Sequence, residues 1–94
     1  MKILLVEDDL ILAEEIVRLC RKWGFEAEYL EEFQAVDREY TKRQADLILM
    51  DINLPFYDGF YWAKEIRKLS RVPILFLSSR DQNSDKVMAM VSWG

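Results

Sequence analysis

The sequence has no histidine, and this absence excludes several kinds of chemistry at once. A metal site built on imidazole, a Ser-His triad and a phosphohistidine formed within the chain all require that side chain. The single cysteine, Cys20, cannot form a disulfide within the chain. Because extracellular domains of this size usually depend on disulfides, we expect a cytoplasmic location.

An excess of positive charge and long apolar runs are missing as well. Lys and Arg number 13 against 17 Asp and Glu, which gives a net charge of −4. A nucleic-acid-binding surface needs a basic face, and a membrane span needs about 20 apolar residues in a row. We therefore expect no direct nucleic-acid binding and no membrane contact. With 51% hydrophobic residues, the 94-residue chain can form the core of one small domain.

Short apolar runs alternate with helical spacing along the whole chain. Strands are expected at 3–6, 25–30 (near a sheet edge), 47–50 and 72–77, and helices at 10–23, around 33–40, at 60–69 and from 83 onward. Strands that alternate with helices form right-handed βαβ units. The sequence therefore predicts an α/β fold, an open parallel sheet with helices on both faces.

The helical spacing also predicts which side chains face the core and where helices begin. Asp9 and Asp58 are expected to be N-caps, and Asn83 and Ser84 offer caps for the last helix. The expected core face of the first helix comprises Leu12, Ile16, Leu19, Cys20 and Trp23; that of the third comprises Phe60, Ala63, Ile66 and Leu69; that of the last comprises Val87, Met90 and Val91.

Acidic residues follow two of the expected strands. Glu7 and Asp8 follow the first strand, and Asp51 follows the third. If these strands are neighbours, the carboxylates converge at the sheet edge where open α/β folds bind ligands. Three carboxylates repel one another unless they are protonated or neutralised by a cation. Since Mg²⁺ prefers carboxylates, waters and phosphate oxygens, the sequence predicts a magnesium site.

Three stretches resemble the receiver domain of bacterial two-component response regulators. They are LLVEDD at 4–9, DINLPFYDG at 51–59 and PILFLSS at 73–79, in the order and at the spacing of that family. The resemblance implies a CheY-like (flavodoxin-like) sheet with strand order 2-1-3-4. It covers residues 1–94 as a single receiver domain that is incomplete at its C-terminus. The stretch 54–62 also resembles OmpR-like regulators that respond to envelope stress or antimicrobial peptides.

The resemblance implies a role for each acidic residue. Asp51 would accept a phosphoryl group from a sensor histidine kinase, and Ser78 would contact that group and act in the switch. Asp8, Asp51 and the main-chain carbonyl of Asn53 would bind Mg²⁺, with Glu7 acting through a water. The segment would be a regulatory switch for a DNA-binding output domain absent from it. It would not be an enzyme beyond catalysing its own phosphorylation and dephosphorylation.

The family's fifth strand, its lysine and its fifth helix would lie after Gly94. Arg80 and Lys86 are cations, but neither matches the position of that lysine. Without a fifth strand, the fourth strand would expose an unpaired edge and the last helix would expose apolar residues. We therefore expect self-association through these two elements.

Two other functions compete with the switch. One is a magnesium-dependent phosphohydrolase with an aspartyl nucleophile; such enzymes usually carry a D-x-D pair on the first strand, whereas this chain has Glu7-Asp8-Asp9 there. The other is a scaffold that binds partners without phosphorylation, which the absence of the family's lysine would favour.

Overall fold

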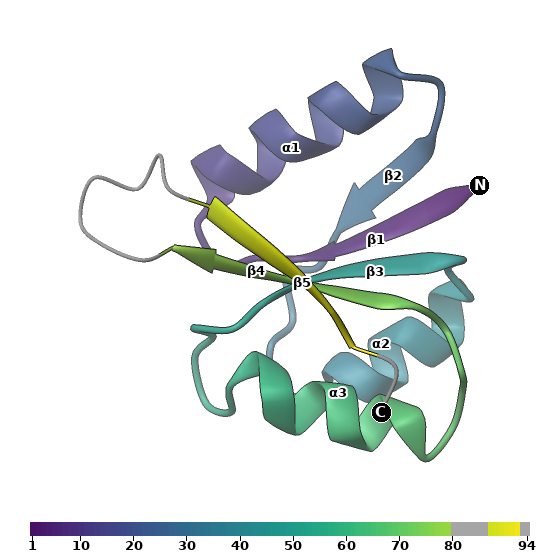
Figure 1. The fold of residues 1–94 in the computed structure, drawn as a ribbon, viewed down its shortest axis with the longest axis vertical. Helices are drawn as coiled ribbons and strands as arrows, with labels where there is room; N and C mark the ends of the chain where they lie inside the picture. Colours follow the sequence, from purple (N-terminus) through teal and green to yellow (C-terminus); the bar gives the residue numbers. More distant parts are fainter. Residues whose placement is uncertain (80–86, 93–94) are drawn as a thin grey trace.

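Five strands form a single sheet in the order β2-β1-β3-β4-β5. The computed structural model describes residues 1–79 and 87–92, with side chains to residue 77. Along the chain the elements are β1 (Lys2–Val6), α1 (Leu10–Lys22), β2 (Glu26–Tyr29), α2 (Val36–Arg43), β3 (Leu47–Asp51), α3 (Gly59–Arg67), β4 (Ile74–Ser79) and β5 (Val87–Ser92) (Figure 1). Of the helices in these ranges, none is long and apolar enough to cross a membrane.

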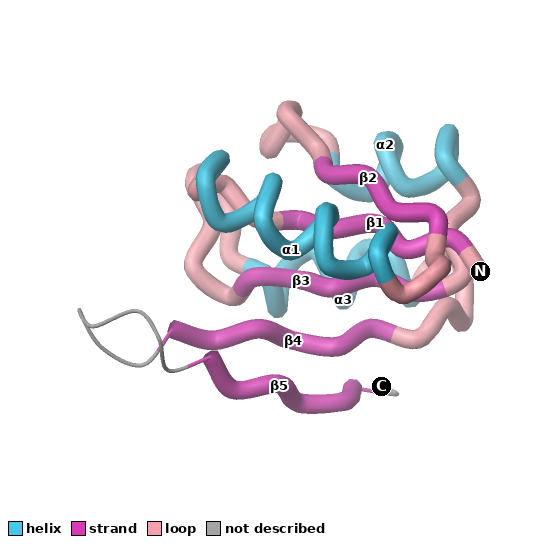
Figure 2. The backbone as a smooth tube through the Cα atoms, turned by 90° about the horizontal axis from the view of Figure 1, so that it is seen from above, coloured by secondary structure: helices cyan, strands magenta, loops and turns pink. Residues whose placement is uncertain are grey.

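The four parallel strands confirm the predicted order 2-1-3-4. β1 pairs with β2 on one side and β3 on the other, and β3 pairs with β4. Figure 2 shows these strands side by side, with β2 at one edge as predicted. Val6 lies opposite Met50 in the register of β1 and β3. The residues that follow Val6 and Met50 therefore meet at the same end of the sheet.

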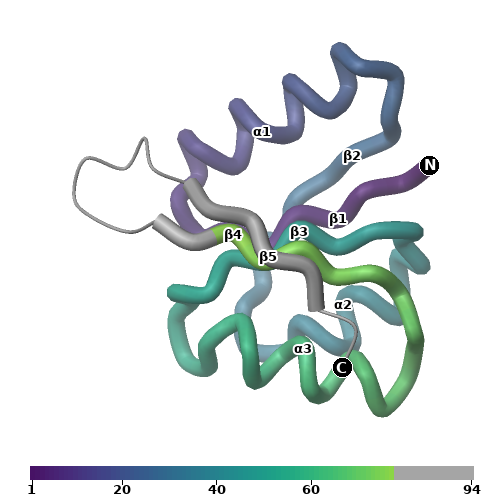
Figure 3. Tube along the Cα trace, viewed as in Figure 1, coloured from purple at the N-terminus to yellow at the C-terminus, as the bar shows by residue number. Residues whose placement is uncertain are grey.

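Alternate residues of the central strands enter two separate clusters, because successive side chains of a strand point to opposite faces. The face toward α2 and α3 includes Leu4, Val6, Ile48 and Met50, all with no exposed surface. The other face packs against α1 alone and includes Ile3 and Leu5. Figure 3 shows the helices that cover the two faces: α1 lies on one side of the sheet, and α2 and α3 lie on the other.

Side-chain caps fix the starts of α1 and α3, as predicted. Asp9 accepts a hydrogen bond from the amide of Leu12 at 3.2 Å, and Asp58 accepts one from the amide of Tyr61 at 2.9 Å. Both aspartates therefore satisfy helix N–H groups that would otherwise have no partner. At the other end of α1, Gly24 takes a positive φ of 93° and ends the helix.

The predicted core face of α1 is only partly correct. Ile16 and Cys20 pack against the core as predicted, but the helix is rotated so that other residues are the most buried. Ala13 and Val17 are its buried residues, whereas Leu19 and Trp23 are 43% and 76% exposed. Trp23 is the C-cap, outside the regular helix. The small Ala13 side chain packs against the sheet, whereas Trp23, the largest apolar residue of the predicted face, is exposed.

Of the predicted core face of α3, Ala63 and Ile66 are buried, whereas Phe60 and Leu69 are exposed. Phe60 is 49% exposed and rests against the ring of Phe76 with centroids 4.8 Å apart, and Leu69 lies after the end of α3. Trp62 takes the buried position with only 3% exposure. The larger indole buries more apolar surface than the phenyl ring, and this sets the rotation of the helix.

The last helix is a further correction, because residues 87–92 form β5, an antiparallel strand on the outer edge of β4. β4 has backbone donors and acceptors along that edge, and a local antiparallel strand satisfies them. The expected caps Asn83 and Ser84 lie outside the described residues. Since β5 pairs with that edge, β4 does not have the unpaired edge through which self-association was expected. β5 is also not the parallel fifth strand that the family resemblance places after Gly94.

Candidate functional site

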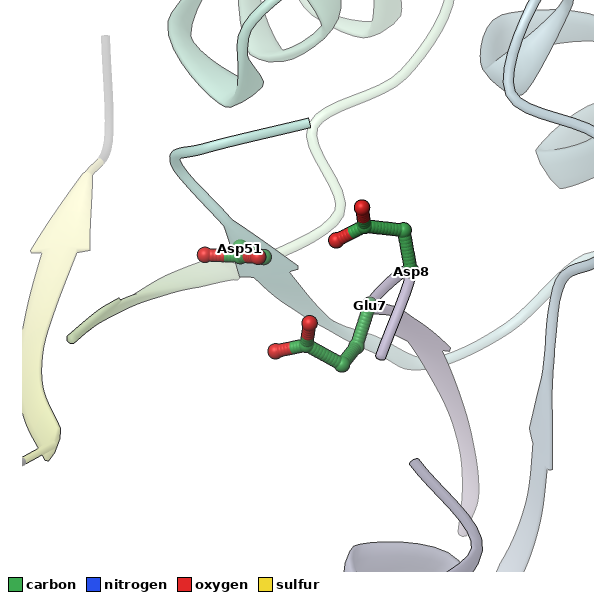
Figure 4. A group of neighbouring side chains, drawn as sticks. All are labelled: Glu7, Asp8 and Asp51. Carbon is green, nitrogen blue, oxygen red and sulfur yellow. The ribbon is translucent and has the colours of Figure 1, made fainter. Parts of the chain in front are cut away.

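Three carboxylates gather at the carboxyl end of the sheet, as the sequence predicts. Glu7 and Asp8 directly follow β1, and Asp51 is the last residue of β3 (Figure 4). One carboxylate oxygen of each residue lies within 4.8 Å of those of the other two. The register between β1 and β3 produces this arrangement, because it places the ends of both strands at the same level.

Backbone amides hold two of the carboxylates in place. The amide of Asp9 donates to Glu7 Oε2 at 3.0 Å, and the amide of Asn53 donates to Asp51 Oδ1 at 3.2 Å. Glu7 and Asp51 are each only 7% exposed, whereas Asp8 is exposed to solvent. The cluster therefore has two buried acids and one that is open to solvent.

The pKa of Glu7 is raised to about 8, mainly by burial and also by the negative charges of Asp51 and Asp8, against the opposing effect of the Asp9 amide. Burial also raises the pKa of Asp51, with the Asn53 amide acting in the opposite direction. A hydrogen bond between the Glu7 and Asp51 carboxyls raises the pKa of Glu7 and lowers that of Asp51. Glu7 is therefore the acid that holds a proton when no cation is bound.

The ion pairs among the described residues do not include Glu7, Asp8 or Asp51. The site thus concentrates oxygen ligands and negative charge without a positive side chain from residues 1–77 to offset them. A hard divalent cation fits such a donor set, because Mg²⁺ binds one or two carboxylates and keeps several waters.

The loop from 52 to 58 starts directly after Asp51, and Gly59 at its other end lies against the backbone of Asp51. The amide of Gly59 donates to the carbonyl of Ile52 at 2.9 Å. A Cβ atom at Gly59 would lie 2.2 Å from the carbonyl oxygen of Asp51, so only glycine fits there. Gly59 belongs to the motif at 51–59, but the motif alone does not reveal this contact. A glycine directly after an N-cap aspartate was the available signal.

The remaining predicted site residues lie around this cluster. Asn53 is exposed at the start of the loop. Ser78 is in β4, one residue after Leu77, which lies opposite Asp51 in the register. The side chain of Ser78 lies outside the described residues, and so do Arg80 and Lys86.

Comparisons with known proteins agree with this geometry. The family model described as "Response regulator receiver domain" matches residues 3–93. "Response regulator protein GraR" of Staphylococcus haemolyticus is 47% identical over 90 residues, which are 96% of this chain and 40% of the relative. The protein of the same name from Staphylococcus aureus is 44% identical over the same shares. The chain thus spans about two fifths of the length of these relatives.

Two solved structures share the fold. The N-terminal domain of the nisin resistance regulator NsrR, described as a lantibiotic response regulator, has a TM-score of 0.75 at 39% identity, covering 86% of this chain and 69% of that one. The BeF3-activated receiver domain of Klebsiella pneumoniae RstA has a TM-score of 0.80 at 28% identity, covering 88% and 71%. On its sequence and its fold, the chain belongs to the response regulator receiver domain family.

Proposed function

We propose that the chain is a phosphorylation-dependent switch in which Asp51 accepts the phosphoryl group. The observation that carries this proposal is the position of Asp51: it ends a central strand, with the carboxylates of Glu7 and Asp8 within 4.8 Å. The family match and the GraR relatives support the switch over the phosphohydrolase considered from the sequence.

Asp8 and Asp51 are the carboxylates we assign to Mg²⁺, together with the main-chain carbonyl of Asn53. Glu7 would act through a water, since it is buried and its pKa is raised to about 8. The acidic cluster and the known use of Mg²⁺ by receiver domains support this assignment. When bound, the ion would neutralise charge on the phosphoryl oxygens.

The transfer itself needs little covalent chemistry from the protein. One Asp51 carboxylate oxygen attacks phosphorus, the N–P bond of a phosphohistidine breaks, and the electron pair of that bond leaves with the imidazole. The amide of Asn53 holds Oδ1 of Asp51, which orients the carboxylate for attack. Ser78 would then bind a phosphoryl oxygen, and its movement would report the modification.

The partner would be a sensor histidine kinase, which supplies the phosphohistidine that this chain cannot form because it has no histidine. We assign the site of transfer to the cytoplasm, an assignment that the lack of an internal disulfide supports. The likeness to NsrR supports a role in a response to antimicrobial peptides. In the whole protein, the switch would control a DNA-binding output domain.

The direct test is labelling by acetyl phosphate with and without Mg²⁺, followed by intact mass measurement. We expect weak labelling that requires Mg²⁺ and is abolished by Asp51→Asn. Labelling that persists in Asp51→Asn, or that is unaffected by a chelator, would refute the assignment. Turnover of a generic phosphate ester by the unchanged chain would favour the phosphohydrolase instead.

A further inference from the structure

Phe56 combines two unfavourable features in the loop that follows Asp51. Its φ is 71°, and the amide of Tyr57 donates to the carbonyl of Pro55 at 2.9 Å across it. These features define the γ-turn with a positive φ at its centre, which is rare and strained. The Phe56 side chain is also 67% exposed. Glycine would avoid both costs, so neither the turn nor the packing of the core accounts for a phenyl ring here.

Three further exposed aromatic side chains follow Phe56 on the same loop and at the start of α3. Tyr57 and Tyr61 are 50% and 40% exposed and stack with their ring centroids 4.2 Å apart. Both tyrosines contact the buried Trp62 edge-on, at 5.7 Å and 4.9 Å between centroids. We call Phe56, Tyr57, Phe60 and Tyr61 the aromatic surface. Because Trp62 lies beneath its tyrosines, little side-chain entropy remains to be lost there on binding.

The aromatic surface lies beside the proposed phosphoacceptor. Phe56 is three residues before Gly59, whose backbone abuts the carbonyl of Asp51. Three residues of chain span at most about 11 Å, so the Phe56 backbone lies within about 15 Å of Asp51. A standard protein interface covers about 800 Å² on each partner, which corresponds to a disc of about 16 Å radius. Phe56 therefore falls within the area that a partner of standard interface size would cover if its interface were centred on Asp51.

We propose that the aromatic surface, and Phe56 above all, is a docking site for the phosphohistidine-bearing domain of the donor kinase. This inference rests on the proposed function, because the donor is defined by delivery to Asp51. Exposed aromatic side chains on a fixed support are the usual anchors of protein interfaces. A small acyl phosphate needs only Asp51 and its cation, whereas a donor protein also contacts the loop. Phe56 thus acts in the choice of protein donor and not in the chemical step.

The test compares two donors on the same variants. Acetyl phosphate in excess reports the chemistry at Asp51. The protein donor is the autophosphorylated cytoplasmic part of a histidine kinase, selected from a panel as the one that transfers fastest to the unchanged chain. We expect Phe56→Gly to lower kcat/KM for the kinase at least tenfold, mainly through KM, while acetyl phosphate labelling changes less than twofold. Thermal melting should show a Tm that is unchanged or raised.

Two further variants serve as controls. Phe56→Tyr keeps an aromatic ring and should retain kinase transfer within about threefold. Trp23→Ala removes an exposed aromatic ring at the amino end of the sheet, where Trp23 caps α1, and should change neither reaction. Equal transfer to Phe56→Gly and the unchanged chain would overturn the inference, and so would an equal loss with both donors. If acetyl phosphate does not label Asp51 in the unchanged chain, the proposed function itself fails.

Discussion

The two ends of the sheet differ in how their charges are matched. At the amino end, the amide of Lys2 donates to Asp46 Oδ2 at 2.8 Å, and Lys2 Nζ donates to the carbonyl of Arg43 at 2.9 Å. Arg43 in turn forms ion pairs with Glu28 at 2.6 Å and Glu39 at 3.3 Å. Charged groups from β1, β2 and α2 are therefore paired with one another.

The carboxyl end has the opposite character. Its buried acids Glu7 and Asp51 have no cation among the ion pairs of the described residues, and Phe56 holds a strained turn. Natural domains tolerate such costs where a site acts on a ligand. The amino end of the sheet therefore has matched charges, whereas the carboxyl end concentrates the acids of the candidate site.

The largest expected effect is on the pH dependence of stability. The pKa of Glu7 is raised to about 8 in the folded chain from 4.5. Between these values the unfolded chain loses the proton and the folded chain keeps it, so the free energy of unfolding falls as pH rises. We expect a loss on the order of 2 kcal/mol between pH 5 and 8. Urea unfolding in the presence of a chelator measures it.

Glu7→Gln is the matched control for this pH dependence, because it removes the titrating group and keeps the shape of the side chain. The variant should show a shallower dependence and greater stability than the unchanged chain at pH 8. Parallel curves for the two proteins would show that Glu7 does not titrate in this range.

Mg²⁺ should supply the positive charge that the acids at the carboxyl end of the sheet lack, and should therefore stabilise the folded chain. A site that binds with millimolar affinity gains about 1 kcal/mol of stability in about 10 mM Mg²⁺. Melting temperatures with and without the ion measure the gain at pH 7.5. Replacing both Asp8 and Asp51 by alanine should abolish it, and an equal gain in that double variant would place the ion elsewhere.

Two of the three positive-φ positions among the described residues provide a reciprocal comparison. Gly24, at the amino end, has a φ of 93°, and an added Cβ would meet nothing within 4 Å. Gly24→Ala should therefore cost about 1 kcal/mol through the backbone conformation alone. Phe56→Gly is the opposite exchange at the other end, and should not destabilise the chain. Chemical unfolding of both variants tests the pair, and a stabilised Gly24→Ala would contradict it.

The smallest effect is expected at the paired charges. Glu28→Gln weakens the contact with Arg43, whose side chain is 31% exposed, so solvent already screens the pair. We expect a cost of about 0.5 kcal/mol that becomes smaller at high salt. A loss above about 2 kcal/mol would mean that this ion pair behaves as a buried one.

The strands and the acidic site could be predicted from the sequence because both depend on local pattern. Apolar runs define the parallel strands, and Glu7, Asp8 and Asp51 stand where those runs end. The pairing of β1 with β3 then brings the three acids together. The assignment of Asn53 and Ser78 rests on the family resemblance and stays a prediction.

Other features could not be predicted because they depend on packing between distant elements. The rotation of α1 follows from how closely Ala13 approaches the sheet, and the rotation of α3 from the burial of Trp62. Residues 87–92 carry an apolar pattern that suits a helix as well as a strand. They form a strand because the edge of β4 is available for pairing, and the residues 87–92 alone cannot predict that edge.

The contact between Gly59 and Asp51 also limits how the domain can move. Since there is no room for one carbon atom between the start of α3 and the end of β3, α3 cannot move closer to Asp51 without displacing the end of β3. A change at Asp51 therefore cannot be transmitted by sliding α3 toward the sheet. A conformational response to a change at Asp51 would then move α3 together with the end of β3 or arise at a neighbouring strand such as β4, whose Leu77 lies opposite Asp51.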